Sequence, residues 1–454
     1  MHPQARSWAE RLRSVLIKSA YPLLRWKEDG EETIVSGAAL WCLALERRHR
    51  WRQLGLRPGD IVLSSPVGIS FVIDLVACAI GGQVLWPKPS QTELGGDQSE
   101  DHFAGPSATK TFDSSSNDFV RNYPRGQPAH SRDDFPAFYL QTSGTSGPHA
   151  RTIALSHDAV IYQLDAHLEQ LAPRQSETRI CSLPWNHAFG LILDLLLGIC
   201  ARQDIVLLRT KEITQPTLAL YRALIDERPE WIAAVPRQLD GILSLGVSMP
   251  KLTIHVGGGV LGLRSRELSE SRFGRLVEGY GLTECSPGVL LDGLPLPGTR
   301  VRLSPAGELE VASPSLGTWE NRENFVDSDG FLRTGDIARE DSTGRFSILG
   351  RAGDRIKTRD GAWITRNGLE HDLERVLNVP AVCFLMTTEG PRLVLFVRPE
   401  EPEAESKSRS ALRYLAKRLC GDARVSTKIL SPELQMQIQA SPKKTLEDAL
   451  FSAI

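Results

Sequence analysis

The chain has 454 residues, which is long enough for two or more domains. Hydrophobic residues make up 41% and charged residues 24% of the chain, as in an ordinary globular protein. The formal net charge of -2 argues against a general electrostatic attraction to nucleic acid or to an anionic membrane.

The cysteines and the apolar segments favour a cytoplasmic protein. The seven cysteines are scattered, with no Cys-x-x-Cys pair and no histidine at metal-ligand spacing, which predicts reduced thiols. Residues 1–16 are typical of the start of an amphipathic helix and not of a secretory signal. The most apolar stretch, residues 190–208, is interrupted by charged and amide side chains, which predicts buried core and no membrane span.

Residues 55–89 predict a strand, a helix and a second strand. Residues 60–63 are strand-like, residues 70–82 are helix-like and end on a glycine pair, and residues 83–87 are strand-like again. This order is typical of a βαβ unit in a mainly parallel sheet. Residues 90–134 are polar and rich in Gly, Ser and Asp, which predicts a surface loop or a partly disordered insert.

Strand-like and helix-like segments alternate again from residue 135, and short strands predominate after residue 295. Residues 350–454 repeat a strand–helix pattern of their own, which is enough for a small α/β domain after a hinge. The segments that predict buried strands are residues 138–141, 179–184, 204–208, 231–236 and 252–256.

Residues 142–147 read Thr-Ser-Gly-Thr-Ser-Gly directly after a strand-like segment. Small and hydroxyl residues expose backbone N–H groups and add side-chain donors, and both suit phosphate oxygens. No Gly-Lys-[Ser/Thr] follows, so the segment is not a Walker A loop. By itself the hexapeptide is also compatible with an ordinary Ser/Gly linker.

Four further motifs follow along the chain: Val256-Gly257-Gly258-Gly259, Tyr280-Gly281-Leu282-Thr283-Glu284, Leu332-Arg333-Thr334-Gly335-Asp336 with Gly350-Arg351, and Ser441-Pro442-Lys443-Lys444-Thr445-Leu446. Together with the hexapeptide, this set resembles the signature motifs of the adenylate-forming superfamily of acyl- and aryl-CoA ligases, luciferases and peptide-synthetase adenylation domains. The resemblance covers roughly residues 55–450. It implies an α/β fold, with a large N-terminal domain of parallel sheets and a β-rich subdomain (residues 1–351) and a small mobile C-terminal α/β domain (residues 352–454).

The resemblance implies that the hexapeptide and the glycine turn bind ATP. Arg151 stands where relatives have a lysine, with one residue inserted before it, and arginine keeps the charge but not the geometry of lysine. The residues assigned to this part of the nucleotide site are Thr142, Ser143, Gly144, Thr145, Ser146, Gly147, Arg151, Gly257, Gly258 and Gly259.

Further nucleotide contacts are implied by the motifs around Thr283 and Asp336. Tyr280 would stack near adenine, Thr283 would bond the α-phosphate, and Glu284 would hold Mg²⁺, because the attack on phosphorus needs its charge neutralised. Asp336 would accept the ribose hydroxyls, as a carboxylate does in dinucleotide sites, with Arg351 near the ribose or phosphate. Taken singly, these residues also fit a capped helix start and an ordinary turn.

The last motif implies a catalytic lysine. The spacing to Leu450 selects Lys444, which would stabilise the bridging and carboxylate oxygens during adenylation. Lys443 occupies the usual glycine position of the family and stays an alternative. A lysine in a tail is otherwise simply solvated, and only the accompanying motifs favour a role.

The hinge and the acid-binding residues resemble those of hydroxycinnamate- and hydroxybenzoate-type ligases. Gly353 stands where relatives have a pivot aspartate, and glycine tolerates large backbone rotation. His187 would close over an aryl acid, although a packed core histidine is the alternative. Arg237 would bind a carboxylate or hydroxyl group of the acid, and it is equally compatible with a surface position. The other residues assigned to the acid are Trp185, Phe189, Val235 and Gly279.

The sequence thus predicts an ATP- and Mg²⁺-dependent ligase that forms an acyl-AMP, with an aryl acid favoured, and transfers the acyl group to CoA or to the phosphopantetheine thiol of a separate acyl carrier protein. A succinylbenzoate-type or fatty acyl ligase is the alternative within the superfamily. A nucleotide-binding regulatory protein with degraded catalysis is the alternative from another class, suggested by Arg151 and Gly353.

Overall fold

The computed structural model describes residues 8–18, 22–28, 31–87, 110–113, 118–122, 135–142, 152–208, 216–319, 326–357, 363–365, 382–387, 390–397 and 424–429. These residues belong to two compact units. The first unit comprises Met1–Gly259, Arg272–Val301 and Val311–Leu332, and the second comprises Val260–Ser271, Arg302–Glu310 and Arg333–Ile454. The predicted division into domains at residues 351 and 352 stays a prediction.

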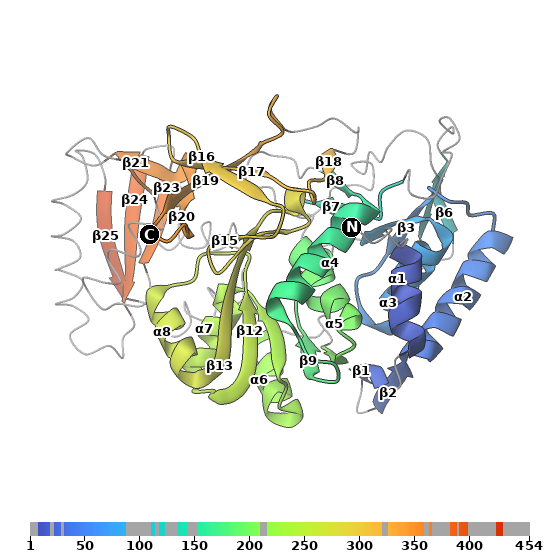
Figure 1. Ribbon diagram of the computed structural model, residues 1–454. Coiled ribbons are helices and arrows are strands. Elements are labelled where there is room, and N and C mark those ends of the chain that lie inside the picture. The colour runs from blue at the N-terminus through green and yellow to red at the C-terminus, as the bar shows by residue number, and fades with distance from the viewer. Residues whose placement is uncertain are drawn as a thin grey trace. The chain divides into compact units, whose positions relative to one another are not determined.

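A nine-stranded sheet forms one layer of the first unit (Figure 1). Its middle strands are parallel from β13 to β1, and antiparallel strands flank them at both edges. The strands, in their order across the sheet, are β15 (Leu294–Pro295), β14 (Gly288–Leu291), β13 (Phe273–Gly281), β12 (Met249–Val256), β11 (Trp231–Ala234), β9 (Thr178–Cys181), β10 (Asp204–Leu207), β1 (Pro22–Glu28) and β2 (Glu31–Ser36).

A seven-stranded sheet forms the other layer, with β3, β4, β5 and β7 joined by parallel pairs. In order, its strands are β18 (Thr318–Trp319), β8 (Thr152–Leu155), β7 (Phe138–Gln141), β4 (Val84–Pro87), β3 (Ile61–Ser64), β5 (Lys110–Asp113) and β6 (Asp118–Asn122).

The prediction that residues 90–134 form only a loop or insert is wrong for β5 and β6. These two segments extend the seven-stranded sheet to its edge, β5 parallel to β3 and β6 antiparallel to β5. Each contains β-branched or aromatic residues, Thr111-Phe112 and Phe119-Val120, among polar ones. An edge strand needs no continuous apolar run, so the polar composition concealed the pair.

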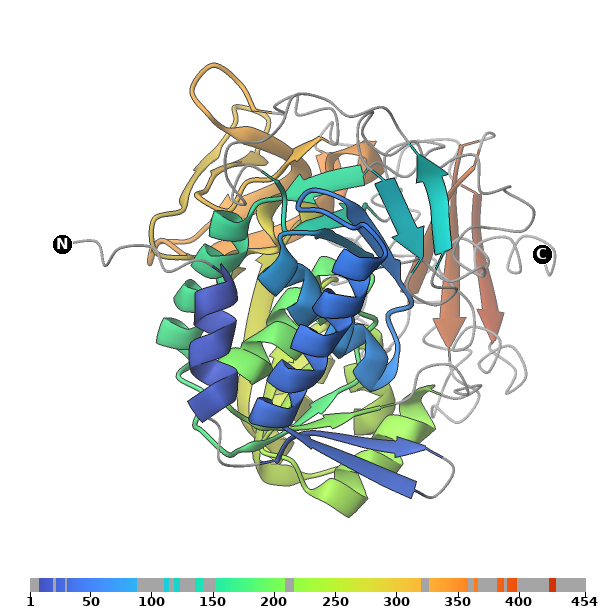
Figure 2. The ribbon, with the colours of Figure 1, turned by 90° about the vertical axis from the view of Figure 1, so that its right-hand side faces the viewer.

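Helices between the two sheets share one hydrophobic core with both (Figures 1 and 2). The core contains Leu24 and Val277 from the larger sheet, Val62 and Phe138 from the smaller one, and the apolar faces of the helices between them. The helices of the first unit are α1 (Trp8–Lys18), α2 (Gly37–Gln53), α3 (Gly68–Gly81), α4 (His157–Leu171), the π-helix η3 (Phe189–Leu196), α5 (Leu197–Cys200), α6 (Pro216–Glu227), α7 (Pro236–Ser244) and the 3₁₀ turn η4 (Thr283–Cys285).

A buried ion pair joins the π-helix η3 to β9. Arg179 on β9 and Asp194 on η3 are fully buried, and their nearest charged atoms, Nη1 and Oδ1, are 3.5 Å apart. Arg179 also donates to Gln203 Oε1 at 2.6 Å and lies over the ring of Trp231. Asp194 accepts hydrogen bonds from the backbone N–H groups of residues 182 and 183, each at 3.2 Å, so the pair ties η3 to the segment that follows β9.

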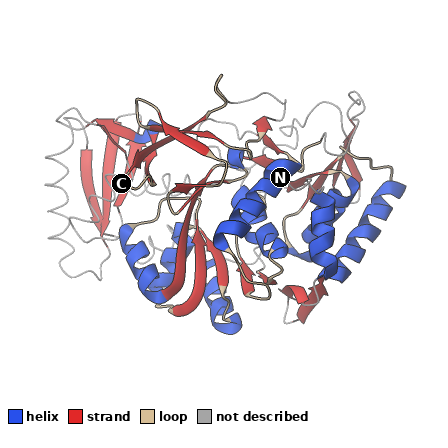
Figure 3. Ribbon diagram, in the orientation of Figure 1, coloured by secondary structure: helices blue, strands red, loops and turns tan. Residues whose placement is uncertain are grey.

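The described residues of the second unit lie mainly in strands, as Figure 3 shows. A four-stranded sheet has the order β16 (Arg300–Leu303), β17 (Glu308–Ala312), β19 (Leu332–Glu340) and β20 (Phe346–Arg351). Its other described elements are α8 (Leu263–Arg272), η5 (Ala352–Asp354), the pair β21 (Arg355–Lys357) and β22 (Trp363–Thr365), and the three-stranded sheet of β23 (Val382–Thr387), β24 (Gly390–Val397) and β25 (Arg424–Ile429).

The predicted fold class is confirmed: the chain is α/β, with parallel sheets and a strand-rich part. The strands expected at residues 138–141, 204–208, 231–236 and 252–256 are present. Among the helices that the structure describes, none combines the length and the apolar character needed to cross a membrane.

Asp194→Ala should lower the free energy of unfolding by about 3–5 kcal/mol, because it leaves the buried Arg179 charge without its carboxylate. Arg179→Met combined with Asp194→Leu should recover most of that loss, since no unpaired charge remains. Urea denaturation of the three proteins measures both effects. Glu310→Ala, which breaks the more exposed pair with Arg302, is the control and should cost about 1 kcal/mol or less. A double variant as unstable as Asp194→Ala would contradict the charge-based explanation.

Candidate functional site

Four segments that contain predicted site residues of the first unit follow the carboxyl ends of neighbouring parallel strands. β9, β11, β12 and β13 lie side by side in the larger sheet. Residues 182–189 follow β9, Val235 follows β11, residues 257–259 follow β12, and residues 282–284 follow β13. The carboxyl ends of parallel strands meet at one edge of a sheet, where open α/β sheets bind their ligands. The structure therefore brings these segments together.

The glycine turn after β12 passes close to its neighbours. A Cβ atom on Gly257 would lie 3.1 Å from the carbonyl oxygen of Gly279 and 3.3 Å from Cζ of Phe189. Gly258 has a φ of +76°, in the left-handed region that favours glycine. The backbone therefore favours glycine at positions 257 and 258, and the predicted approach of this turn to a nucleotide stays a prediction.

The segment with Thr283 and Glu284 begins with the short turn η4 directly after β13. Both side chains are half-buried. The carbonyl oxygen of Glu284 accepts a hydrogen bond from the N–H of Gly317 at 2.8 Å. A single carboxylate fits the predicted Mg²⁺ role, because Mg²⁺ commonly takes one or two carboxylates, with waters and substrate phosphates as its other ligands. No group of three potential metal ligands occurs within the described ranges.

Gln163 on α4 holds the backbone that follows Glu284. Its Nε2 lies 2.8 Å from the carbonyl oxygen of Cys285 and 2.7 Å from that of Gly288. Its Oε1 accepts from the N–H of Gly288 at 3.2 Å, and Ser315 Oγ lies 2.8 Å from both Nε2 of Gln163 and the oxygen of Cys285. The side chain is fully buried. This network fixes residues 285–288 to α4, and the α4 helix itself begins directly after β8 and Ser156.

The residues assigned to the acid have different environments. Trp185 is buried in the core and stacks on Phe71, with ring centroids 5.5 Å apart. His187 is exposed, so it is not the packed core histidine that was the alternative. Phe189 is half-buried at the start of η3, and Arg237 is exposed in the first turn of α7. Contact of these side chains with an acid stays a prediction.

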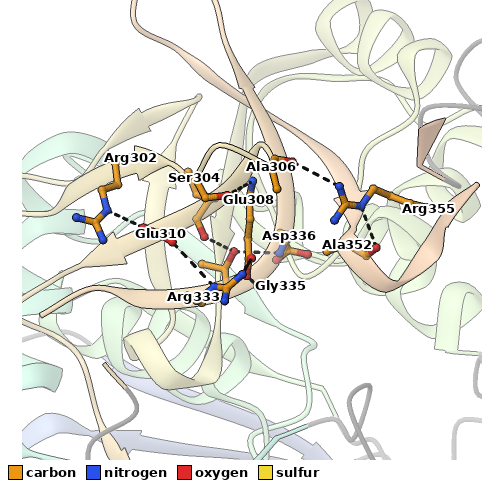
Figure 4. Close-up of polar contacts among 12 residues, drawn as sticks. Arg302, Ser304, Ala306, Glu308, Glu310, Arg333, Gly335, Asp336, Ala352 and Arg355 are labelled. Atoms are coloured by element: carbon orange, nitrogen blue, oxygen red, sulfur yellow. Dashed lines mark hydrogen bonds and ion pairs between the residues drawn. The ribbon is translucent and has the colours of Figure 1, made fainter. Parts of the chain in front are cut away.

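In the second unit, Asp336 and Arg351 lie opposite each other on β19 and β20. Arg351 Nε lies 3.1 Å from Asp336 Oδ1, and Arg351 Nη1 donates to the carbonyl oxygen of Thr334 at 3.1 Å. The Asp336 side chain is buried. Figure 4 shows the neighbouring support: Glu308 accepts from the N–H of Gly335 at 2.9 Å, beside its ion pair with Arg333. The guanidinium of Arg351 therefore lies against the buried carboxylate of Asp336, and the contact of Asp336 with the ribose hydroxyls stays a prediction.

The hinge candidate Gly353 lies in η5, where a Cβ would meet no atom within 4 Å. Local crowding therefore does not demand glycine at this position. Part of the predicted site lies outside the described residues, although Thr142, directly after β7, is described. The residues outside are Ser143, Gly144, Thr145, Ser146, Gly147, Arg151, Lys443 and Lys444.

Two buried residues beside the site were not predicted. His255 is the penultimate residue of β12 and packs edge-on against Phe189, with ring centroids 5.2 Å apart. His167 on α4 has its ring centroid 5.8 Å from that of His255. The available signal was a lone histidine in the apolar segment Leu252–Val256, directly before the glycine turn.

A family model described as AMP-binding enzyme matches residues 85–314, about half of the chain. Among curated proteins, 4-coumarate–CoA ligase-like 8 of Arabidopsis thaliana is 25% identical over 276 residues, which cover 53% of this chain and 49% of the relative. A long-chain-fatty-acid–CoA ligase of Yersinia pestis is 31% identical over 255 residues, which cover 48% and 44% respectively. The chain therefore spans about half the length of the curated relatives it matches.

A solved structure, that of the anthranilate CoA ligase AuaEII in complex with anthranoyl-AMP, superposes with a TM-score of 0.75. The match covers 100% of this chain and 99% of the other at 17% sequence identity. At this identity the likeness concerns the fold.

Gln163→Leu should lower the free energy of unfolding by about 1–3 kcal/mol, because it removes the buried amide that donates to the carbonyls of residues 285 and 288 and accepts from the N–H of residue 288. Thermal or urea denaturation measures the change. Gln53→Leu, at an exposed position of α2, serves as the control and should be nearly neutral. Equal effects of the two substitutions would contradict a holding role for Gln163.

Proposed function

Because the chain belongs to the AMP-binding enzyme family, we propose that it is an ATP-dependent acid ligase that forms an acyl-AMP and transfers the acyl group to a thiol. The proposal is carried by three segments that emerge at one edge of the larger sheet: the glycine turn 257–259, the Thr283–Glu284 segment and residues 182–189, which end in Phe189. A nucleotide and a carboxylic acid would have to meet at one place for adenylation, and these segments supply contacts for both.

In the first step, an oxygen of the acid carboxylate attacks the α-phosphorus of ATP, a P–O bond forms to give the acyl-AMP, and pyrophosphate leaves. Thr283 would donate its hydroxyl hydrogen to an α-phosphate oxygen. Glu284 would hold Mg²⁺, which neutralises phosphate charge when bound. The close backbone approach at Gly257 would place the nucleotide beside Phe189. Asp336 would accept the ribose hydroxyls.

In the second step, the sulfur of a thiolate attacks the acyl carbon and AMP leaves, so that a thioester forms. The thiol would belong to CoA or to the phosphopantetheine arm of a separate acyl carrier protein. Relatives named as CoA ligases support CoA as the acceptor. Gly353 would act as the hinge whose rotation withdraws Lys444 and admits the thiol.

We favour a small aryl or arylpropenoic acid as the substrate. Phe189 offers an aromatic edge beside the glycine turn, and flat rings gain about 0.5–1.5 kcal/mol from good ring geometry beyond their buried area. Arg237, at the start of α7, would repel a substrate ammonium group, which argues against an amino acid. The match to a long-chain-fatty-acid–CoA ligase keeps a fatty acid as the second candidate.

An acid panel assayed by ATP-dependent pyrophosphate release tests both candidates. Aryl or arylpropenoic acids should give higher kcat/KM than acetate, long-chain fatty acids or amino acids, because only a flat ring uses the aromatic edge. Highest turnover on a long-chain fatty acid would overturn the aryl assignment. Highest turnover on an aryl dicarboxylate would overturn only the choice of a monoacid, and no release with any acid would favour a regulatory nucleotide-binding protein.

Lys444→Ala should abolish acid-dependent pyrophosphate release while largely sparing thioester formation from supplied acyl-AMP. The lysine charge is needed only in the first step, when the carboxylate oxygen bonds to the α-phosphorus and pyrophosphate leaves. Lys443→Ala is the matched control and should keep both half-reactions. Separate assays of the two half-reactions distinguish these outcomes. If Lys443→Ala shows the selective loss and Lys444→Ala does not, the assignment of the catalytic lysine is wrong.

A further inference from the structure

The carboxylate of Glu308, the first residue of β17, is buried and bonded to two residues of β19. Its Oε1 accepts from the N–H of Gly335 at 2.9 Å, and its Oε2 accepts from Nη2 of Arg333 at 2.6 Å. Figure 4 shows the carboxylate beside these two residues. A buried carboxylate is costly to desolvate unless such partners compensate it. Both oxygens bond to the chain itself, which indicates a role in holding β19.

The backbone of β19 departs from the extended conformation at Gly335, directly before Asp336. Its φ of +73° lies in the left-handed region, which glycine reaches without strain. The N–H groups of paired strands ordinarily bond to carbonyl oxygens of the neighbouring strand. The N–H of Gly335 donates instead to the side chain of Glu308. The orientation of this peptide group therefore depends on Glu308.

The residues on either side of Gly335 are fixed by the hydroxyl group of Thr334. Thr334 Oγ1 donates to the carbonyl oxygen of Leu309 at 2.8 Å and accepts from the N–H of Asp336 at 3.0 Å. Glu308 and Leu309 are consecutive in β17, so together they hold residues 334–336. The contact from Glu308 acts at the residue with the most backbone freedom, because glycine populates both signs of φ.

The turn before β17 holds the backbone of Glu308 in place. The N–H of Glu308 donates to Ser304 Oγ at 3.1 Å, and the N–H of Ser304 donates to the carbonyl oxygen of Glu308 at 2.9 Å. The N–H of Gly307 donates to the carbonyl oxygen of Ser304 at 2.8 Å, and the carbonyl oxygen of Gly307 accepts from Ala338 at 3.0 Å. The length of the Glu308 side chain then determines whether its carboxylate reaches Gly335.

We infer that Glu308 is a positioning residue for Asp336: by holding the N–H of Gly335, it fixes the direction of the Asp336 carboxylate. The inference rests on the proposed function, in which Asp336 accepts the ribose hydroxyls of ATP. Arg351 contacts the carboxylate itself, whereas Glu308 sets the backbone from which the side chain starts. Hydrogen bonds weaken steeply when their geometry departs from the preferred one. Glu308 therefore determines how strongly the protein distinguishes a ribose with hydroxyl groups from one without them.

Calorimetric binding of ATP and of 2′,3′-dideoxy-ATP, each with Mg²⁺, tests the inference without knowledge of the acid. The unmodified protein should bind ATP about tenfold to a hundredfold more tightly, because the dideoxy sugar offers Asp336 no hydroxyl donor. Asp336→Ala is the reference and should bring this ratio near one. A ratio near one in the unmodified protein, or an unchanged ratio in Asp336→Ala, would overturn the ribose role of Asp336 in the proposed function, and the inference with it.

Two conservative variants separate the reach of the side chain from its charge. Glu308→Gln keeps an acceptor oxygen at the same reach and should keep most of the ratio, because the exposed Arg333 can turn to water. Glu308→Asp keeps the charge but is one methylene shorter and falls short of the N–H of Gly335. It should bring the ratio toward one with unchanged affinity for dideoxy-ATP, which also reports that the variant folds.

Glu310→Gln is the matched control. Glu310 lies two residues along β17, pairs with Arg302 at 2.6 Å and lies 4.0 Å from Arg333, so the substitution removes a charge from the same strand. The ratio should stay unchanged in this variant. A ratio kept in Glu308→Asp and lost in Glu308→Gln would assign the effect to the charge pair with Arg333 and overturn the inference. An equal loss of affinity for both nucleotides would also overturn it, because a merely structural role has that effect.

Discussion

Parallel hydrogen bonding between β12 and β13 aligns His255 with Val277 and Val256 with Glu278. This register brings the glycine turn after β12 beside Gly279 near the end of β13, with room for backbone but not for a side chain at position 257. β11 and β9 continue the parallel arrangement across the sheet, so their following segments emerge at the same edge. A different register would separate the glycine turn from Thr283, and neither segment alone would provide a site.

Buried polar side chains in the first unit fall into three classes, according to how their hydrogen-bonding groups and charges are satisfied. Arg179 and Asp194 form an ion pair, yet burial still raises the pKa of Asp194 to about 6, because Arg179 offsets only part of the desolvation. Gln163 uses both ends of its amide on backbone groups, with Ser315 Oγ as a further partner. His255 is left with neither nitrogen bonded within the described part of the chain. The first two classes hold segments in place.

The sequence predicted most strands of the larger sheet, because strands buried on both faces appear as short apolar runs bounded by turn residues. It missed β5 and β6, since edge strands carry polar residues that resemble a loop. It pointed to the segments of the candidate site through residue types that the backbone favours, such as Gly257 and Gly258. It missed His255 and Gln163, because their importance depends on which residues meet across α4, β12 and β13, and contacts between distant segments leave no local pattern. Nor does the apolar run 189–196 show from its residues that it winds as a π-helix.

The close packing of α4 against residues 285–288 has a consequence for how such a chain diverges or is recombined. A Cβ on Gly288 would lie 2.5 Å from Cε1 of His167 and 2.7 Å from Oε1 of Gln163, so the strand and the helix fit only as a matched set. α4 also begins immediately after β8, and both follow Thr142 in the sequence. A chimera that imports residues 283–288 from a relative without the corresponding turn of α4 would bring a mismatched surface into the interior. Gln163, His167 and Gly288 should therefore be inherited together, and a crossover point between residues 171 and 273 would divide them.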